Sequence, residues 1–370
     1  MKVTIEPFAP HHLPSIKALN ARLRSGGTDS GFLLPEQFPE LAPPAQERRP
    51  IDKRQFIVAD EGVVRGGYML QKQEFLVDGR PVVIGNIQMP ITEGVIDKKF
   101  SALGGLLVRE ITRVCPLLFA LGMGGRQNSF PRLLRAMGWT LLDVPFFFHV
   151  NHPNRFLRNI GPLRTSSLRR VAAALAAGTG AGWAGIRLIQ ARMSGATPAH
   201  SVEPIADFGP WTDELWSQCQ GSSFFCGVRS RAALEHFYPA DQTRYLRYRM
   251  TADGAVVGWV VLVDTQMRDH PYFGNLRVGT IVDGTALPEH TAAVVRSAAR
   301  TLEQRGADLT ICNHSDATWI AALRRAGFLS GPSNYVFAMS KELAKLLQPL
   351  PENLPRMFLN RGDGEGPTRL

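Results

Sequence analysis

The chain has 370 residues, of which 44% are hydrophobic and 20% are charged, and it carries a formal net charge of +10. This composition is typical of a soluble globular protein, and the length is sufficient for two domains with separate cores. The first ten residues lack the basic and then apolar layout of a secretory signal. We therefore expect a cytoplasmic rather than a secreted protein.

Cysteine usage argues against a metal centre. The four cysteines form no CxxC pair and show no zinc-like spacing with histidine. We expect four free, mostly buried thiols and no metal cofactor.

The first 150 residues predict an alternation of strands and helices. A strand is predicted at 3–8, a helix at 12–24 and a proline-rich loop at 35–50. Three strands follow at 55–62, 63–80 and 81–92, with a turn at Asp78 and Gly79. A helix at 98–114, a buried strand at 116–123, a helix at 129–138 and a strand at 139–150 complete this half.

The C-terminal half predicts the same order again. A strand at 200–208 precedes two helices, 211–220 and 230–238. Strands at 243–254 and 255–266 are joined by a turn at Asp253 and Gly254, and a third strand covers 276–287. A helix at 289–306, a strand at 307–315, a helix at 316–327 and a strand at 334–340 follow. The two halves indicate a duplication of architecture.

This repeated order resembles that of the GNAT acyltransferase superfamily. The best local match is an asparagine that opens a helix ending in glycine and an aromatic residue, here Asn128 to Gly138 and Trp139. A looser copy runs from Asn313 to Gly327. The resemblance implies an α+β fold of two tandem GNAT-like domains, 1–150 and 202–342, each with a mixed, mostly antiparallel sheet flanked by helices. A basic helical linker at 151–201 and a flexible tail at 343–370 complete the expected organisation.

The resemblance also implies that the pyrophosphate of acetyl-CoA or another acyl-CoA binds between the fourth strand and the next helix. Backbone N–H groups at a helix N-terminus favour an anion there. In the first half Lys98 stands at the family's arginine position, although Ser101 and Leu103 replace two glycines. The expected donor-binding residues are Ile91, Lys98, Lys99, Ser101, Leu103, Gly104, Gly105 and Asn128. An ordinary helix start with exposed lysines is the alternative interpretation of this segment.

The corresponding loop of the second half is less suitable for a phosphate. Glu289 and Thr291 occupy the two glycine positions there. A carboxylate at that position would repel phosphate, so we favour the first half as the donor site.

Acyl transfer to an amine requires a base for the amine and a proton for the departing thiolate. The resemblance implies a carboxylate on or near the fourth strand, for which Glu93 is the first candidate and Glu74 on the preceding strand the second. Asp283 occupies the comparable place in the second half. For each of these carboxylates, a surface or turn position is the interpretation that the sequence favours over a catalytic one.

The tyrosine that supplies the proton in many members of the superfamily is missing from the late helix. Leu133 and Leu134 stand there in the first half, and Ala322 and Leu323 in the second. The sequence therefore predicts either that solvent protonates the thiolate or that activity is absent.

Positive charge is concentrated in the segment 144–202, which contains no acidic residue. This segment is either a solvated linker or a surface for a polyanion such as tRNA or an anionic lipid. Its uncharged part, 171–186, is shorter than the roughly 20 residues that span a bilayer. We expect a helix packed between domains, with peripheral membrane contact as the alternative.

Taken together, these features predict an enzyme, an N-acyltransferase that moves an acyl group, first of all acetyl, from acyl-CoA to an amine. Two alternatives stay open. Paired domains of this kind also resemble the Fem-type aminoacyltransferases, whose donor is aminoacyl-tRNA. A non-catalytic scaffold that retained the fold is the other.

Overall fold

A computed structural model describes residues 3–27, 33–36, 51–161, 184–186, 188, 190 and 200–364. The chain divides into two compact units, which are described separately. The first contains residues 1–143 and 334–350, and the second contains residues 144–333 and 351–368. The predicted tandem of α+β sheets is confirmed, but each unit is assembled from two separate stretches of the chain.

The first unit is built on a sheet with strand order β1-β2-β3-β4-β5-β15-β6. Its strands are β1 (Val3–Pro7), β2 (Ile51–Asp60), β3 (Val63–Val77), β4 (Arg80–Thr92), β5 (Leu118–Leu121), β6 (Thr140–Asp143) and β15 (Val336–Met339). Its helices are η1 (Pro10–His12), α1 (Leu13–Ser25), η2 (Glu93–Val95), η3 (Lys98–Phe100), α2 (Ala102–Val114), α3 (Ser129–Ala136) and α11 (Lys341–Leu346).

Two apolar layers hold the helices of the first unit on opposite faces of its sheet. Helices α2 and α3 bury Leu103, Leu107 and Leu134 against the strands. Helix α1 buries Ile16 and Leu19 with the apolar residues of the other face. The helical spacing of these side chains is what the sequence pattern indicated.

The second unit has a seven-stranded sheet with order β14-β7-β13-β12-β11-β10-β8. Its strands are β7 (Phe146–Val150), β8 (Ser201–Pro204), β10 (Leu246–Ala252), β11 (Ala255–Gln266), β12 (Arg277–Ala286), β13 (Leu309–Asn313) and β14 (Leu329–Gly331). Helices α9 (Thr291–Gln304) and α10 (Ala317–Arg325) pack on one face, and α7 (Trp211–Cys219) and α8 (Arg231–Phe237) pack on the other. Helix α4 (Pro153–Asn159) and the short helices η5 (Gln220–Ser222) and η6 (Pro288–His290) complete this part of the unit.

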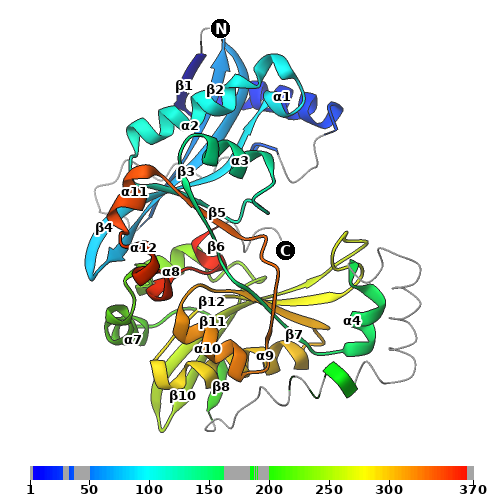
Figure 1. Ribbon diagram of the computed structural model, residues 1–370, viewed down its shortest axis with the longest axis vertical. Helices are drawn as coiled ribbons and strands as arrows, with labels where there is room; N and C mark the ends of the chain where they lie inside the picture. The colour runs from blue at the N-terminus through cyan, green and yellow to red at the C-terminus, as the bar shows by residue number, and fades with distance from the viewer. Residues whose placement is uncertain are drawn as a thin grey trace. The chain divides into compact units, whose positions relative to one another are not determined.

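The two sheets exchange their late strands. The sequence predicted one strand at 139–150, but the structure has two strands there, β6 and β7. Strand β6 belongs to the first sheet, whereas β7 pairs with β13 and β14 in the second. Strand β15, predicted for the second half, instead lies between β5 and β6 of the first sheet. Figure 1 shows β15, in orange, among the strands of the N-terminal half. Chain order therefore does not decide which sheet each of these strands joins.

The fourth strand of each half carries a β-bulge. In the first sheet Met69 pairs with Gln88 whereas Gly67 pairs with Ile91, so β4 has one extra residue, and Met89 has a positive φ of 48°. In the second sheet the register shifts between Val261 and Leu262 of β11, leaving an extra residue on β12. Such bulges bend a strand away from its neighbour.

The C-terminal tail is ordered up to residue 364, which corrects the expectation of a flexible tail for this part. Residues 350–363 form α12 (Leu350–Asn353), η7 (Leu354–Arg356), β16 (Met357–Phe358) and η8 (Arg361–Asp363). Strand β16 pairs in parallel with β9 (Phe225–Gly227). Arg361 and Asp363 are buried, and so are Met357 and Leu359. Polar and apolar contacts together therefore fix this segment.

Most of the predicted basic linker, including the uncharged stretch at 171–186, lies outside the described residues. In the described part of the chain, no helix has the length and apolarity needed to cross a membrane. The four cysteines are buried thiols that form no disulfide, as expected.

Candidate functional site

Strands β4 and β5 of the first unit separate at their carboxyl ends. They pair in parallel only at Gly85 with Leu118 and at Asn86 with Phe119. Strand β4 continues to Thr92, past the bulge, while β5 ends at Leu121. The bulge thus opens the sheet directly before the loop that leads to helix α2.

The loop expected to bind the donor presents its lysines to solvent. Lys98 and Lys99 lie in η3 and are exposed, and Ser101 at the start of α2 is exposed as well. The side chain of Asp97 accepts a hydrogen bond of 2.9 Å from the backbone N–H of Lys99. This carboxylate occupies one backbone N–H group and reduces the positive potential of the loop. With Lys98 and Lys99, the loop still has a net positive charge.

The other expected donor residues have different surroundings. Leu103 is fully buried in the core, so it presents no surface to a ligand. A Cβ atom at Gly105 would meet nothing within 4 Å, whereas one at Gly104 would come within 3.3 Å of Leu133. Near the start of α2, Gly105 therefore has open space beside its backbone, whereas Gly104 packs against α3.

Ile91 and Asn128 lie away from the lysines in the chain. Ile91 is buried in the apolar layer beneath α1, so its side chain packs rather than binds. Asn128 precedes α3, and its Nδ2 donates a hydrogen bond of 3.2 Å to the carbonyl of Met123. Asn128 thus fixes the loop at the end of β5.

Glu93 is held by two arginines. Its carboxylate accepts bonds from Arg22 Nε at 2.7 Å and from Arg65 Nη1 at 2.8 Å, and only 6% of its side chain is exposed. Burial alone would raise the pKa of Glu93, but the two arginines outweigh it and lower that pKa. A carboxylate held in this way is a poor proton acceptor, so the geometry favours a structural role.

We expect Glu93→Gln to lower the free energy of unfolding by about 1–3 kcal/mol at pH 7, because the partly exposed Arg22 and Arg65 lose their buried, charged partner. The pKa of Glu93 in the folded protein lies below its unfolded value of 4.5. The stabilisation by its ion pairs is therefore fully present above pH 4.5 and is lost as the pH falls through the folded pKa. Urea unfolding at pH 7 and at pH 3 measures both effects.

The matched control is Asp52→Asn, which removes an exposed pair with Arg54. It should change stability by no more than about 0.5 kcal/mol. A Glu93→Gln deficit that stays constant down to pH 3 would contradict the ion-pair explanation.

Glu74 lies far from Glu93 in the first unit. It pairs with Val83 on β4, close to the turn at Asp78, whereas Glu93 follows the other end of that strand. Ten residues of strand separate them, which corresponds to roughly 30 Å. The two carboxylates cannot act on one substrate amine.

Asp283 lies beside the bulge of β12 in the second unit, and its carboxylate is saturated with donors. Oδ2 accepts from Arg229 Nε and from the Tyr238 hydroxyl, both at 2.9 Å. Oδ1 accepts from Asn360 Nδ2 at 2.8 Å and from the backbone N–H of Gly284 at 2.9 Å. Its side chain has no exposed surface, so this geometry also favours a structural role.

A tyrosine absent from the predicted site lies at the end of β5. Tyr335 precedes the exchanged strand β15, and a Cβ atom built on Gly122 would approach its ring to 2.6 Å. The backbone N–H of Gly122 donates a hydrogen bond of 3.1 Å to the carbonyl of Val336. Only glycine permits this contact, and its φ of 82° suits glycine as well. Sequence reasoning missed Tyr335 because it assigned this strand to the other sheet.

No protein-family model and no curated protein matches the chain. Solved structures do match it. A probable N-acyltransferase from Enterococcus faecalis V583 aligns with a TM-score of 0.52 and 8% identity, over 94% of this chain and 74% of that protein. A GCN5-related N-acetyltransferase from Anabaena variabilis aligns with a TM-score of 0.51 and 10% identity, over 91% and 72%.

A third similar structure is N-myristoyltransferase of Saccharomyces cerevisiae, solved with myristoyl-CoA and inhibitors. It aligns with a TM-score of 0.50 and 11% identity, over 91% of this chain and 79% of that protein. Because these alignments cover more than nine-tenths of the chain, they include both sheets. This protein therefore has the fold of the GNAT acyltransferases, built as a tandem of two α+β units with exchanged strands.

Proposed function

We propose that this protein is an N-acyltransferase that moves an acyl group from acyl-CoA to an amine, with the donor bound by the first unit. The observation that carries the proposal is the separation of β4 and β5 directly before an exposed, lysine-bearing helix start. The gap between the two separated strands gives the thioester arm room. The lysines and the N-terminus of α2 attract the phosphates.

Tyr335 gives this site a proton donor. Its phenol lies against Gly122, at the end of one of the two separating strands. In the reaction the amine nitrogen bonds to the acyl carbon, a base takes the amine proton, and the carbon–sulfur bond breaks. We propose that Tyr335 protonates the departing thiolate, which replaces the missing tyrosine of the late helix.

Isothermal titration of the whole protein with acetyl-CoA and longer acyl-CoAs tests the donor site. We expect native binding and an affinity about 100-fold weaker for the double variant Lys98→Glu/Lys99→Glu, because two attractive charges become repulsive. The acyl chain bound most tightly would then define the donor for an acceptor screen.

The control carries the same charge change elsewhere on the first unit. Lys17→Glu/Arg80→Glu alters two exposed residues, one on α1 and one at the β3–β4 turn. It should bind acyl-CoA nearly as tightly as the native protein. Failure of the native protein to bind any acyl-CoA would refute the proposal, and equal losses in the two double variants would refute the assignment to the loop.

A further inference from the structure

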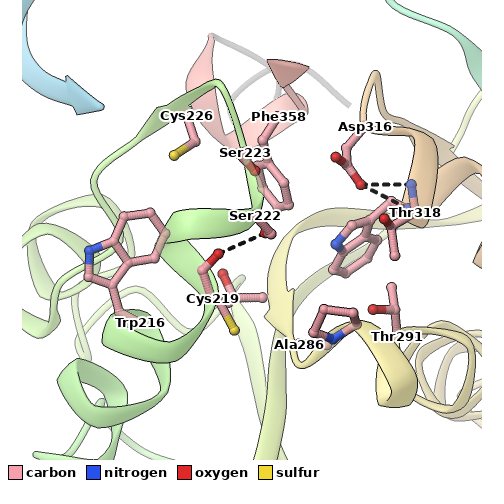
Figure 2. Close-up of a pocket in the computed structure, with 13 residues that line it drawn as sticks. Trp216, Cys219, Ser222, Ser223, Cys226, Ala286, Thr291, Asp316, Thr318 and Phe358 are labelled. Carbon is pink, nitrogen blue, oxygen red and sulfur yellow. Dashed lines mark hydrogen bonds between the residues drawn. The ribbon is translucent and has the colours of Figure 1, made fainter. Parts of the chain in front are cut away.

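A pocket opens within the second unit, and the donor proposal does not use it. It lies where the end of β12, the start of α9 and the start of α10 meet α7 and η5, and its empty volume, open mouth included, is about 410 Å³. Figure 2 shows Trp216 on one side and Asp316 with Thr318 on the other, with Phe358 of β16 above. The ordered C-terminal segment therefore supplies part of the wall.

The charge around this pocket is negative. Among the thirteen residues that line it, Asp316 is the one carboxylate, and none is lysine, arginine or histidine. The exposed carboxylate of Glu289 adds negative charge near the pocket-lining Cys219. Burial and this carboxylate together raise the pKa of the Cys219 thiol to about 11. The pocket would repel a phosphate and attract a cation.

Asp316 is buried. Among the described residues, no cationic side chain donates a hydrogen bond to its carboxylate. One carboxylate oxygen caps α10, accepting from the backbone N–H of Thr318 at 2.9 Å and of Trp319 at 3.1 Å. The other oxygen points away from these donors (Figure 2). Burial raises the pKa of Asp316 more than its hydrogen bonds with the two backbone N–H groups and with the Thr318 side chain lower it. An ammonium ion in the pocket would relieve that cost.

The aromatic walls suit the same kind of ligand. Trp319 is held in place by His314, whose ring stacks on it with centroids 4.8 Å apart. Phe358 meets His314 edge-on at 4.6 Å. Burial and Arg229 lower the pKa of His314 to about 3, so this imidazole is neutral and adds no positive charge. Indole and phenyl surfaces attract organic cations through their π-electrons.

An unsatisfied hydroxyl also lines the pocket. Thr285 is 3% exposed, and its Oγ1 has no hydrogen-bond partner in the described part of the chain. A buried hydroxyl without a partner costs free energy, so a ligand that hydrogen-bonds to it gains affinity. An ammonium group donates such a bond.

From these four features we infer that the pocket of the second unit binds an organic ammonium ion, with Asp316 as counter-ion, the aromatic rings around its apolar part and Thr285 as hydrogen-bond acceptor. Binding here requires no acyl-CoA. The inference therefore stands or falls separately from the proposed donor site.

Three probes with one skeleton and different head groups test the charge preference: 2-phenylethylamine, 2-phenylethanol and phenylacetate. Isothermal titration and the indole NMR signals of the whole protein, without acyl-CoA, report their binding. We expect the amine to bind at least tenfold more tightly than the alcohol, and phenylacetate not to bind. Equal affinity for all three, or preference for the acid, would overturn the inference.

Asp316→Asn removes the charge and keeps a good N-cap, because asparagine caps helices as well as aspartate does. It should weaken amine binding about tenfold and leave the affinity for the alcohol unchanged. The matched control is Asp269→Asn, in an exposed loop at the other end of β11 and β12, where φ is 47° and asparagine is tolerated. An Asp316→Asn protein that binds the amine like the control would refute the role of Asp316.

Thr285→Val tests the hydroxyl without altering volume. If the hydroxyl serves the ligand, the variant should be at least as stable as the native protein and should bind the amine several-fold more weakly. Unchanged amine affinity would remove Thr285 from the proposed site.

Discussion

Replacing Arg229 with methionine will lower the free energy of unfolding of the second unit by about 3–5 kcal/mol, because it leaves two buried carboxylates without their cation. Arg229 is 1% exposed and contacts Asp283 at 2.9 Å and Asp363 at 2.7 Å. Asp283 lies beside the bulge of β12 and Asp363 lies in the C-terminal segment, so Arg229 links the two. Loss of the arginine should therefore also release residues 357–363.

The expected release follows from how that segment is held. Burial and the neighbouring Asp283 raise the pKa of Asp363, and Arg229 opposes them. Without Arg229, the repulsion between the carboxylates is uncompensated. Urea unfolding followed by tryptophan fluorescence measures the stability, and hydrogen exchange at 357–363 measures the release.

The control is Arg231→Met on the adjacent helix, which removes an exposed pair with Glu235 four residues along α8. It should cost no more than about 0.5 kcal/mol. Similar losses in the two variants, or unchanged exchange at 357–363 in Arg229→Met, would show that the buried cluster does not anchor the C-terminal segment.

Once a donor and an acceptor are identified, Tyr335→Phe should lower kcat about 10- to 100-fold and leave acyl-CoA affinity unchanged. Phenylalanine preserves the ring that packs against Gly122 and removes only the proton donor. The ratio of kcat between the variant and the native enzyme, with acyl-CoA affinity from titration, separates a chemical defect from a binding defect.

The leaving group offers a sharper test of the same role. An acyl donor with a more acidic thiol needs less protonation, so the defect of Tyr335→Phe should shrink with such a donor. Tyr272→Phe, a change at an exposed tyrosine of the second unit, is the control and should have native kcat. Native kcat in Tyr335→Phe, or a defect independent of the thiol, would exclude Tyr335 as the acid.

The local elements of this protein follow from its sequence. The turns predicted at Asp78–Gly79 and Asp253–Gly254 join β3 to β4 and β10 to β11, with positive φ at all four residues. The predicted helix stops at Gly138 and Gly327 have φ of 83° and 84°. These features depend on nearest neighbours in the chain, where glycine and side-chain periodicity decide the conformation.

The candidate site was less accessible from sequence. Position relative to the fourth strand led to Glu93 and Asp283, but their partners are remote in the chain, Arg22 for the first and Arg229 for the second. A spacing pattern contains no information on such contacts. Their effect, a buried ion pair in place of a free base, is visible only when the helices are docked on the sheets.

The sequence by itself determined the order of the longer elements, the duplication and the apolar faces, because each depends on residue type and local period. It missed the short strands β9, β14 and β16. Tertiary structure decided that β7 joins the second sheet and β15 the first. Both strands have the same short apolar pattern, and backbone hydrogen bonds do not distinguish one sheet from another. The choice is made by packing between residues far apart in the chain, and it is this choice that brings Tyr335 to Gly122.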